Sequence, residues 1–314
     1  MKLKTKIHKV AEKHHLLMQG YKKLSRIQAG MRKGMSDEEY LKLRYKQAFG
    51  HELNLSNPQT FNEKIQWLKL YDYKPIYTTM VDKYLAKQFI SDRVGSEYVI
   101  PTLGRWDRFE DINFDQLPNR FVLKCNHDCG SVFICKEKKE FDYAGVRRKI
   151  NAALKENYYW GTRERPYKDV KRCIMAEKYM EDSTTHELRD YKFFCFNGVV
   201  KALFIASDRQ KDGEDTKFDF FDADFNHLDF SNGHPNADPL PEKPKSFETM
   251  KKLAAILSDG IPLLRVDFYE VDGSPYVGEL TFSHWNGMVP FKPEEWDYKF
   301  GEWIALPKHK TVGD

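Results

Sequence analysis

The sequence predicts a globular α+β protein with about two domains. Through roughly the first third of the chain, apolar residues recur at helical spacing, whereas from Tyr98 onward short apolar runs alternate with turn signals. The length of 314 residues corresponds to about two domains at roughly 150 residues each. Aromatic residues make up 14% of the chain and charged residues 31%, and this composition excludes disorder as the dominant state.

Two capping boxes mark helix starts in the first third of the chain. Ser36 is followed by Glu39, and Thr60 by Glu63, at the spacing in which each side chain bonds the backbone amide of the other residue. Apolar residues behind the second box fall on one helical face. We therefore expect residues 37–93 to be mainly helical.

The remaining two thirds of the chain are predicted to be rich in β-strands. Asn197-Gly198 and Asp272-Gly273 each separate two apolar runs, and such dipeptides are typical of hairpin turns. Two hairpins are therefore expected. Two helices are also predicted in this part, near residues 144–157 and 246–258.

Two carboxylates lie on the strands of the last predicted hairpin. If the connection consists of the three residues Asp272 to Ser274, Asp267 lies directly across from Glu279, whereas a two-residue turn places them on opposite faces. Opposed carboxylates repel each other and require a compensating cation. Carboxylate oxygens suit Mg²⁺, which completes its shell with water and nucleotide phosphates. The alternative is a pair of exposed acids on a solvated sheet face.

A lysine and a polar loop form a second candidate site. Lys124 stands in an apolar run, and a lysine in a buried strand needs an anionic partner. If that partner is a phosphate, the backbone amides near Gly130 and Ser131, in the loop that begins at Asn126, add donors for it. The alternative is a hairpin whose lysine reaches the surface. The Walker sequence G-x-x-x-x-G-K-[ST] is absent.

The charge is concentrated at the N-terminus. Residues 1–33 contain eight lysines, two arginines and one glutamate, while the whole chain carries a net charge of only +4. This basic segment is expected either to be a solvated helical extension, to dock on the acidic body, or to contact anionic lipid. Nucleic acid is not expected as a partner, because no aromatic residue interleaves with the charges before Tyr21.

The protein is expected in the cytoplasm. Through its basic segment it could also lie at the inner face of the membrane as a peripheral protein. No stretch approaches the roughly 18 consecutive apolar residues of a spanning helix. The first residues also lack the apolar region of a signal peptide.

Six runs of sequence occur in order over about residues 57–303, namely PQTFNEKIQWLKLYD, VDKYLAKQFI, FVLKCNHDCGSVFICK, IMAEKYMED, DYKFFCFNG and RVDFYEVDGSPYVGELTF. Together they resemble the TupA-like ATP-grasp family, which is associated with bacterial cell-surface polysaccharide synthesis. The resemblance implies two α+β lobes whose antiparallel sheets clasp ATP, preceded by a helical N-terminal region. The implied segments are a basic helical arm (1–50), a helical region before the ATP-grasp fold (51–100), a central lobe (101–180) and a C-terminal lobe with the metal site (181–314).

The resemblance also implies where the nucleotide binds. Lys83 and Lys124 match the two lysines that contact phosphate, and the loop from Asn126 to Ser131 stands in place of the phosphate flap. With only Gly130 as a glycine, this loop should be stiffer than the family pattern. The implied adenine and ribose site consists of the hinge Glu177, Lys178, Tyr179 and Met180, with Glu187 for the ribose.

The metal and transfer residues follow from the same resemblance. Asp267 and Glu279 match the two metal carboxylates, and Thr281 replaces the asparagine that usually supplies a further ligand. Arg265 matches the arginine that neutralises an acyl phosphate.

The strand with the second carboxylate is followed by a candidate acceptor pocket. His284, Trp285 and Asn286 combine a titratable ring, an aromatic platform and an amide. The alternative is that Trp285 belongs to the core and that His284 is a satisfied turn residue.

The implied activity is that of an ATP-dependent carboxylate–amine ligase with ATP and Mg²⁺ as cofactors. Its substrates would be the carboxylate of a sugar acid or amino-acid substituent, on a small-molecule or lipid-linked saccharide, together with an amine co-substrate. One alternative is a glycosyltransferase that chelates a metal through Asp222 and Asp224. Another is a binding protein that has the fold without turnover.

Overall fold

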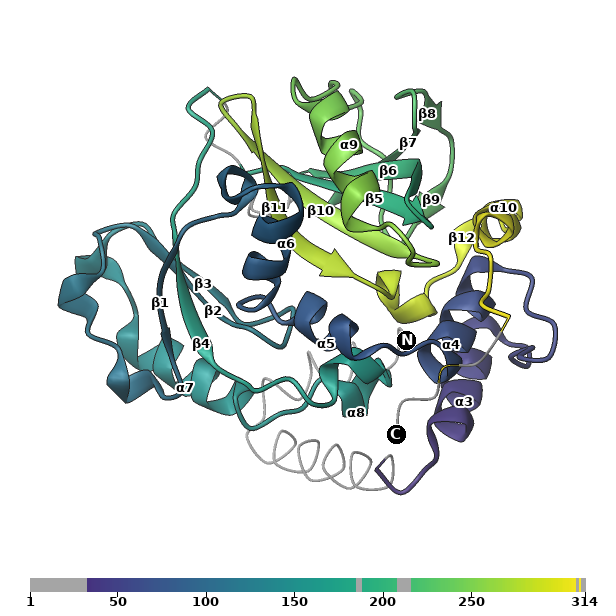
Figure 1. Ribbon diagram of the computed structural model, residues 1–314, viewed down its shortest axis with the longest axis horizontal. Helices are drawn as coiled ribbons and strands as arrows, with labels where there is room; N and C mark the ends of the chain where they lie inside the picture. The colour runs from purple at the N-terminus through teal and green to yellow at the C-terminus, as the bar shows by residue number, and fades with distance from the viewer. Residues whose placement is uncertain (1–32, 185–187, 208–215, 309–310, 312–314) are drawn as a thin grey trace, which may run out of the picture.

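The computed structural model describes residues 33–184, 188–207, 216–308 and 311. It contains a four-stranded sheet, with the strand order β1-β4-β2-β3, and a six-stranded sheet, with the order β11-β10-β5-β6-β7-β8. Both sheets are antiparallel. In Figure 1 the smaller sheet lies to the left and the larger one to the upper right. The predicted α+β class is confirmed.

Four helices make up the N-terminal part of the described chain. They are α3 (Asp37–Phe49), α4 (Phe61–Tyr71), α5 (Pro75–Val81) and α6 (Ala86–Val94). Both predicted capping boxes are present, because the side chains of Ser36 and Thr60 accept from the amides of Glu39 and Glu63 and the glutamates bond back. The mainly helical character expected for residues 37–93 is therefore confirmed.

The smaller sheet has one face covered by a helix. Its strands are β1 (Thr102–Trp106), β2 (Phe121–Cys125), β3 (Val132–Cys135) and β4 (Ile174–Lys178), and the covering helix is α7 (Tyr143–Ala153). The short helix α8 (Tyr159–Thr162) follows α7 in the chain and contacts α3 through Tyr159 and Asp37. Phe121, Leu123 and Ile174 form a core with Ile150 of α7. Because side chains alternate along a strand, Lys124 and Glu177 project from the opposite face.

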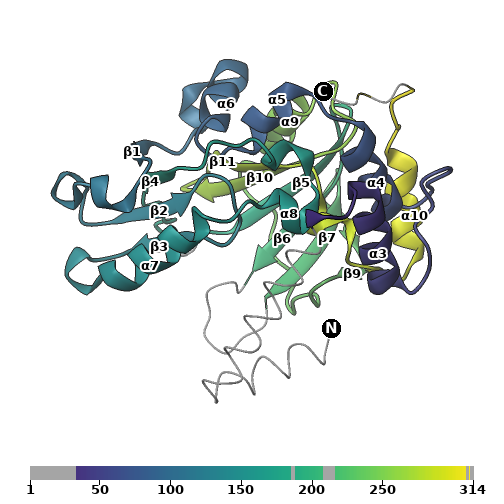
Figure 2. The same ribbon diagram turned by 90° about the horizontal axis from the view of Figure 1, so that it is seen from below.

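The larger sheet is covered on both faces. Its strands are β5 (Asp190–Phe196), β6 (Val199–Ser207), β7 (Lys217–Asp222), β8 (His227–Leu228), β10 (Leu264–Val271) and β11 (Ser274–Thr281). Two short strands, β9 (Ser231–Asn232) and β12 (Phe291–Lys292), pair separately. Helix α9 (Phe247–Leu257) packs on one face, and α4 with α10 (Glu295–Trp303) packs on the other. Figure 2 shows α3, α4 and α10 gathered at one end of the molecule and α7 at the other.

The last hairpin corrects one prediction. Its turn has two residues, because Val271 pairs with Ser274, and a two-residue turn was expected to separate the carboxylates. The register then shifts, so that Phe268 pairs with Val277 but Asp267 pairs with Glu279. This β-bulge adds one residue, Gly278, and returns both carboxylates to one face.

Only glycine fits the bulge without a rearrangement. A Cβ atom at Gly278 would lie 2.6 Å from Cε2 of the Tyr269 ring. The hairpin turns were otherwise placed correctly, since Asn197 and Gly198 connect β5 to β6. Helix α9 matches the helix expected near residues 246–258, while α7 ends four residues before the expected position 157.

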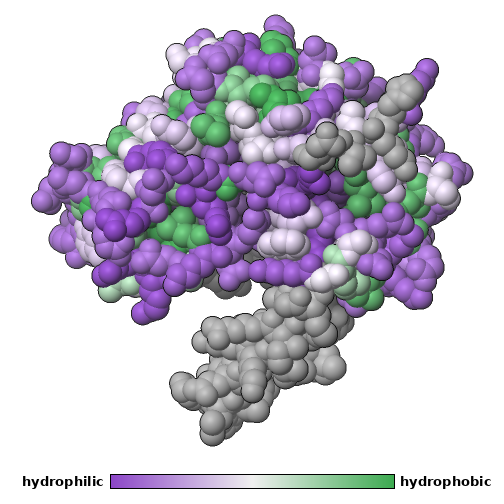
Figure 3. Space-filling view, turned by 60° about the horizontal axis from the view of Figure 1, so that its bottom comes forward, coloured by the Kyte–Doolittle hydropathy of each residue, from purple (hydrophilic) through white to green (hydrophobic). Residues whose placement is uncertain are grey.

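Within the described ranges, no helix combines the length and apolar character needed to cross a bilayer. On the face shown in Figure 3, hydrophilic side chains predominate and hydrophobic ones gather in a few separate groups. The expectations for the basic arm concern residues 1–33, and all of these except Lys33 lie outside the described residues.

Candidate active site

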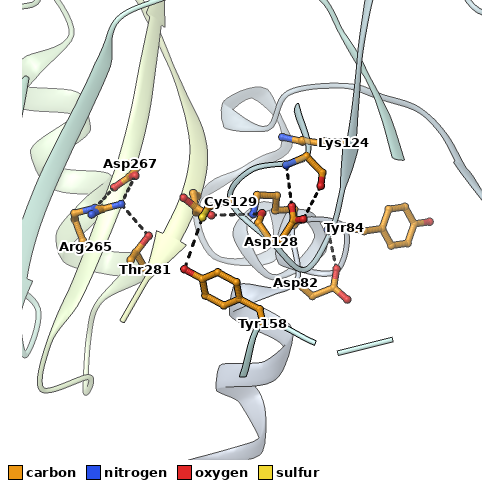
Figure 4. A network of polar contacts seen from close by, with 12 residues as sticks. Asp82, Tyr84, Lys124, Asp128, Cys129, Tyr158, Arg265, Asp267 and Thr281 are labelled. Carbon is orange, nitrogen blue, oxygen red and sulfur yellow. Dashed lines mark hydrogen bonds and ion pairs between the residues drawn. The ribbon is translucent and has the colours of Figure 1, made fainter. Parts of the chain in front are cut away.

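Ionic side chains from the two sheets and from the segment after α5 meet in one region. Lys83, which follows α5, places its Nζ atom 2.9 Å from Oε1 of Glu279 and donates a hydrogen bond of 2.5 Å to the carbonyl oxygen of Asp128. Figure 4 shows Arg265, Asp267 and Thr281 on the strands of one sheet, and Lys124 and Asp128 on the other side of the site. Lys83 thus links the larger sheet to the loop after β2.

The opposed carboxylates have the compensating cations that their repulsion requires. Arg265 donates from Nε and Nη2 to the two oxygens of Asp267, at 2.7 and 2.8 Å. Burial alone would raise the pKa of Glu279, but the charges of Lys83, Lys192 and Arg265 outweigh it and lower the pKa to about 2. Glu279 is therefore held as a carboxylate, the form that binds a hard cation.

Lys192 is a site residue that the sequence reasoning missed. It pairs with Asp267 across β5 and β10, and its Nζ lies 2.5 Å from Oδ2 of Asp267 and 3.0 Å from Oδ1 of Asp190. Burial lowers the pKa of Lys192. The available signal was a single lysine between Tyr191 and Phe193 in an apolar strand, the same signal that identified Lys124.

Glu177 lies between two lysines on the inner face of the smaller sheet. Its oxygens are 2.6 Å from Nζ of Lys124 and 2.7 Å from Nζ of Lys87. Burial acts to raise the pKa of Glu177, but the two lysines outweigh it and lower the pKa. The anionic partner predicted for Lys124 is therefore this carboxylate in the structure, and Lys87 is a second missed residue.

The rest of the predicted hinge begins with Lys178, the last residue of β4. The amide of Lys178 donates to the carbonyl oxygen of Pro101 at 3.0 Å. The guanidinium of Arg120 lies 4.1 Å from the centroid of the Tyr179 ring, which fixes that ring at the edge of the lobe. Met180 comes next along the chain, and Glu187, the predicted ribose residue, lies outside the described residues.

Asn126 anchors the start of the loop that is predicted to act as the phosphate flap. Its side chain is fully buried and donates to Oδ2 of Asp82 at 2.8 Å and to the carbonyl oxygen of Lys171 at 3.0 Å. Its own oxygen accepts from the amide of Cys173 at 2.8 Å. With these contacts made, the side chain is anchored away from any ligand.

The rest of the loop is shaped by Asp128. The hydroxyl of Ser131 donates to Oδ2 of Asp128 at 2.5 Å, and the amide of Ser131 donates to Oδ1 at 3.1 Å. Gly130 is exposed, with nothing within 4 Å of the position that a Cβ atom would take. These hydrogen bonds tie Ser131 to Asp128, and the stiffness expected of the loop stays a prediction.

Arg265 connects the carboxylates to Thr281 and His284. Its Nη2 donates to Oγ1 of Thr281 at 3.1 Å, and its Nη1 donates to Nδ1 of His284 at 2.8 Å. His284 must then be neutral, with its proton on Nε2, which donates to Oδ1 of Asn232 at 2.9 Å. Burial, together with the charges of Arg265 and Lys192, holds the pKa of His284 well below its usual value.

The three predicted acceptor residues are therefore used differently from one another. His284 is buried, so the structure supports the alternative that it is a satisfied residue, and it orients Arg265. Trp285 is 39% exposed and stacks on Phe218, with the ring centroids 5.8 Å apart. Asn286 accepts at its backbone oxygen from Nζ of Lys69 at 2.8 Å.

The backbone of this turn is strained. Trp285 and Asn286 have φ angles of 48° and 59°, in the left-handed region that non-glycine residues seldom adopt. Besides Lys69, the side-chain amide of Gln66 donates from Nε2 to the backbone carbonyl oxygen of Asn286 at 3.1 Å. Two side chains of α4 thus hold the strained turn beside Arg265.

At the alternative metal site, Asp222 and Asp224, the Asp222 carboxylate accepts hydrogen bonds within a turn. Asp222 accepts at Oδ1 from the amides of Asp224 and Asn226, at 2.9 and 2.8 Å, and at Oδ2 from the Asn226 side chain at 2.9 Å. These bonds close the turn after β7. Within the described residues, no group of three or more His, Cys, Asp or Glu side chains surrounds a possible ion.

Comparison with known structures gives distant likenesses. D-alanine–D-alanine ligase from Bacillus anthracis, complexed with ATP, is 16% identical over 65% of this chain and 54% of that one, with a TM-score of 0.38. The Helicobacter pylori enzyme is 14% identical over 80% and 68%, with a TM-score of 0.43. The ATP-grasp ligase PsnB, complexed with its minimal precursor, Mg and ADP, is 11% identical over 71% and 58%, with a TM-score of 0.39.

The chain spans just over half the length of the Bacillus ligase and of PsnB. No curated protein matches its sequence. The sequence model of the family described as TupA-like ATPgrasp matches residues 63–305, which include both sheets and all the ionic residues described above. The chain therefore has the ATP-grasp fold and belongs to the TupA-like ATP-grasp family.

Proposed function

We propose that the chain is an ATP-dependent carboxylate–amine ligase. The observation that carries the proposal is the pair Asp267 and Glu279, opposed on one sheet face and surrounded by the buried cations Lys83, Lys192 and Arg265. Buried charges are costly, and a protein retains such a concentration of them where a reaction uses it.

The residues present fit Mg²⁺ and a triphosphate. Asp267 and Glu279 offer hard carboxylate oxygens, the ligand type that Mg²⁺ prefers, and Thr281 can add a hydroxyl. Lys83 and Lys124 would contact the phosphates, and the backbone at Lys178, Tyr179 and Met180 would read the adenine. When bound, Mg²⁺ would neutralise part of the phosphate charge.

The residues of the chain then act mainly through charge. A substrate carboxylate oxygen attacks the γ-phosphorus of ATP, the bond to ADP breaks, and an acyl phosphate forms. Arg265 would stabilise the charge of the transferring phosphoryl group, and donors of this kind contribute about 3 to 4 kcal/mol each. His284 accepts a hydrogen bond from Arg265 and so keeps its guanidinium in one orientation. An amine then attacks the acyl carbon, phosphate leaves, and an amide results.

The proposed acceptor is a saccharide with a carboxylate, free or lipid-linked. Trp285 supports this, because its partly exposed indole lies one residue from His284 and can stack on a sugar ring. Asn286 would complete the pocket through its amide. The identity of the sugar acid and of the amine is left to the experiment.

The test is a screen for ATP-dependent activation. The protein is incubated with ATP, Mg²⁺ and a panel of sugar acids and amino acids, and hydroxylamine traps any acyl phosphate as a hydroxamate. A ligase gives hydroxamate and ADP with at least one acid. Stabilisation by sugar nucleotides but not by ATP would favour the glycosyltransferase, and ATP binding without any hydroxamate would favour a binding protein.

We also propose peripheral membrane contact through residues 1–33, because their ten cations and one acid would attract anionic lipid. Each well-placed Lys or Arg contributes about 1 kcal/mol near such a surface. Sedimentation with anionic and neutral vesicles at low salt compares the full chain with a chain that starts at Ser36. Equal partitioning of the two onto anionic vesicles would exclude this role.

A further inference from the structure

One buried acid near the proposed active site has no part in the contacts described so far. Glu164 is 4% exposed and lies between α8 and the short 3₁₀ turn η5 (Arg165–Tyr167). It lines a small cavity at the junction of α4, α5 and the end of β11. The other lining side chains are Leu68, Lys69, Asp72, Tyr77, Pro166, Leu263, Phe282 and Ser283.

Glu164 differs in its partners from the glutamates of the two ion-pair clusters. Glu177 and Glu279 each lie within 3.0 Å of a lysine nitrogen. Among the residues that the structure describes, no lysine or arginine nitrogen lies within 4.0 Å of the Glu164 carboxylate, and its one hydrogen-bond partner is Ser283.

The nearest lysine of the cavity is committed elsewhere. Lys69 donates from Nζ to the carbonyl oxygens of Asn286 and Thr162, at 2.8 and 3.2 Å, and to Oε1 of Gln66 at 3.2 Å. It also donates to the side-chain oxygen of Asn286. These neutral acceptors occupy its ammonium, so Lys69 supports the strained turn and is no ion-pair partner of Glu164.

The charge of Glu164 belongs to the same site as the catalytic charges. Burial raises its pKa to about 7, against the opposing effect of Lys69, and the charges of Glu279 and Arg265 also act on it. Ser283 stands two residues beyond Thr281, at the end of the strand that carries Glu279. A buried acid at this point suits a cationic ligand that arrives from outside the chain.

We propose that Glu164 binds the ammonium group of the amine co-substrate and accepts a proton from it. This inference rests on the proposed ligase function and names the residue that handles the second substrate. The apolar side chains Leu68, Leu263 and Phe282 line the same cavity and limit its contact with water, which strengthens the attraction between the carboxylate and an ammonium group.

The proton balance of the amine step assigns one role to Glu164. The ammonium transfers one proton to the Glu164 carboxylate, and its nitrogen then has a free electron pair. The new bond joins this nitrogen to the acyl carbon, while the bond from that carbon to the phosphate oxygen breaks and the phosphate leaves with the electron pair. The second nitrogen proton leaves with the phosphate, and Glu164 later releases its proton to solvent.

The first test compares the thermal stability of two matched variants at pH 8. Glu177→Gln removes the charge of a carboxylate that has two lysine partners, so the Tm of this variant should fall by several degrees. Glu164→Gln removes a buried charge that has no cationic partner, so its Tm should equal or exceed that of the wild type. A fall in Tm for Glu164→Gln as large as that for Glu177→Gln would mean that Glu164 is a structural ion-pair partner, and would overturn the proposal.

The second test uses a simple amine as the probe. Methylammonium chloride at a concentration near its Kd should raise the Tm of the wild type by about 1 °C relative to equal sodium chloride. Tetramethylammonium, which has no proton to donate, should give no rise, and neither should methylammonium with Glu164→Gln. The assignment would be overturned if methylammonium raised the Tm of both proteins equally. It would also be overturned if methylammonium at up to roughly 200 mM, a range that covers weak ligands, left the Tm of the wild type unchanged.

The same wild-type protein is examined with ATP and Mg²⁺, which separates the two proposals. A shift with methylammonium but none with ATP and Mg²⁺ would count against the ligase alone. A shift with ATP and Mg²⁺ but none with methylammonium would count against Glu164 alone.

Discussion

The two sheets carry ionic clusters that differ in charge balance. The smaller-sheet cluster consists of Glu177 with Lys87 and Lys124. The larger-sheet cluster consists of Asp190, Asp267 and Glu279 with Lys83, Lys192 and Arg265. The first therefore has one cation in excess, whereas the charges of the second cancel.

This difference matches what each sheet is proposed to bind. An excess cation on the smaller sheet suits a phosphate, which is an anion. The balanced cluster is suited to binding Mg²⁺ and phosphate together, because the charges of these two ligands offset each other. Lys83 and Arg265 would then exchange their carboxylate partners for phosphate oxygens. The following predictions test whether the two clusters are separable in this way.

Removal of Glu279 should have the largest effect. Glu279→Ala leaves Lys83 buried beside Asp128 without its ion-pair partner, so we expect a loss of about 3 to 5 kcal/mol in the free energy of unfolding. Binding of Mg²⁺ and ATP should be lost as well. Urea unfolding and isothermal titration measure the two effects.

The matched control for this variant is Glu156→Ala, because Glu156 is exposed and lies far along the chain from both clusters. It should change neither the free energy of unfolding nor ATP binding. If Glu279→Ala bound Mg²⁺ and ATP as tightly as the wild type, the metal assignment would be wrong.

The lowered pKa of Glu279 predicts a pH dependence. The folded pKa is about 2 and the ordinary value is 4.5, so the folded state binds the proton more weakly than the unfolded state. The resulting stability is present above about pH 4.5 and is lost as the pH falls towards 2, by about 3 kcal/mol in all.

Comparison with Glu279→Gln isolates this contribution, since the variant cannot titrate at that position. The difference in unfolding free energy between wild type and variant should shrink between pH 4.5 and pH 2. A difference that stays constant over this interval would show that Glu279 is not held as a carboxylate by its neighbours.

The smaller-sheet cluster should lose ligand affinity with little loss of stability. In Lys124→Met, Glu177 retains Lys87 as its partner at 2.7 Å, so the fold should survive. A charged hydrogen bond to phosphate contributes about 2 kcal/mol, which corresponds to a roughly thirtyfold weaker affinity for ATP. Titration calorimetry checks this value, with the exposed Lys155→Met as the control. Equal affinities of both variants would place the triphosphate elsewhere.

The sequence predicted those parts of the fold and site that depend on local pattern. The capping boxes at Ser36 and Thr60 need only residues three apart, and both are present. A single lysine in an apolar strand identified Lys124, because burial of a lone charge is costly wherever the strand lies.

The unpredicted parts depend on contacts between distant segments. Lys87 reaches Glu177 from a helix 90 residues earlier in the chain, and no local pattern connects the two. Asn126 stands in a polar loop that resembles a ligand-binding loop, but its side chain is a buried anchor. Only its contacts with Asp82 and Lys171 show this. Charge type is visible in the sequence, whereas the partner of each charge is a property of the fold.

The smallest effect is predicted at the β-bulge of the last hairpin, in the larger sheet. A Cβ atom at Gly278 would lie 2.6 Å from the Tyr269 ring, so Gly278→Ala should force this ring to move and cost about 1 to 2 kcal/mol of folding stability. Removal of the ring should relieve the clash, and Tyr269→Ala combined with Gly278→Ala should be less destabilised than the sum of the single variants. Urea unfolding of the four proteins gives this coupling, and ATP titration shows whether a disturbed bulge also separates Asp267 from Glu279. Strict additivity of the two substitutions would mean that the bulge does not depend on the space beside Tyr269.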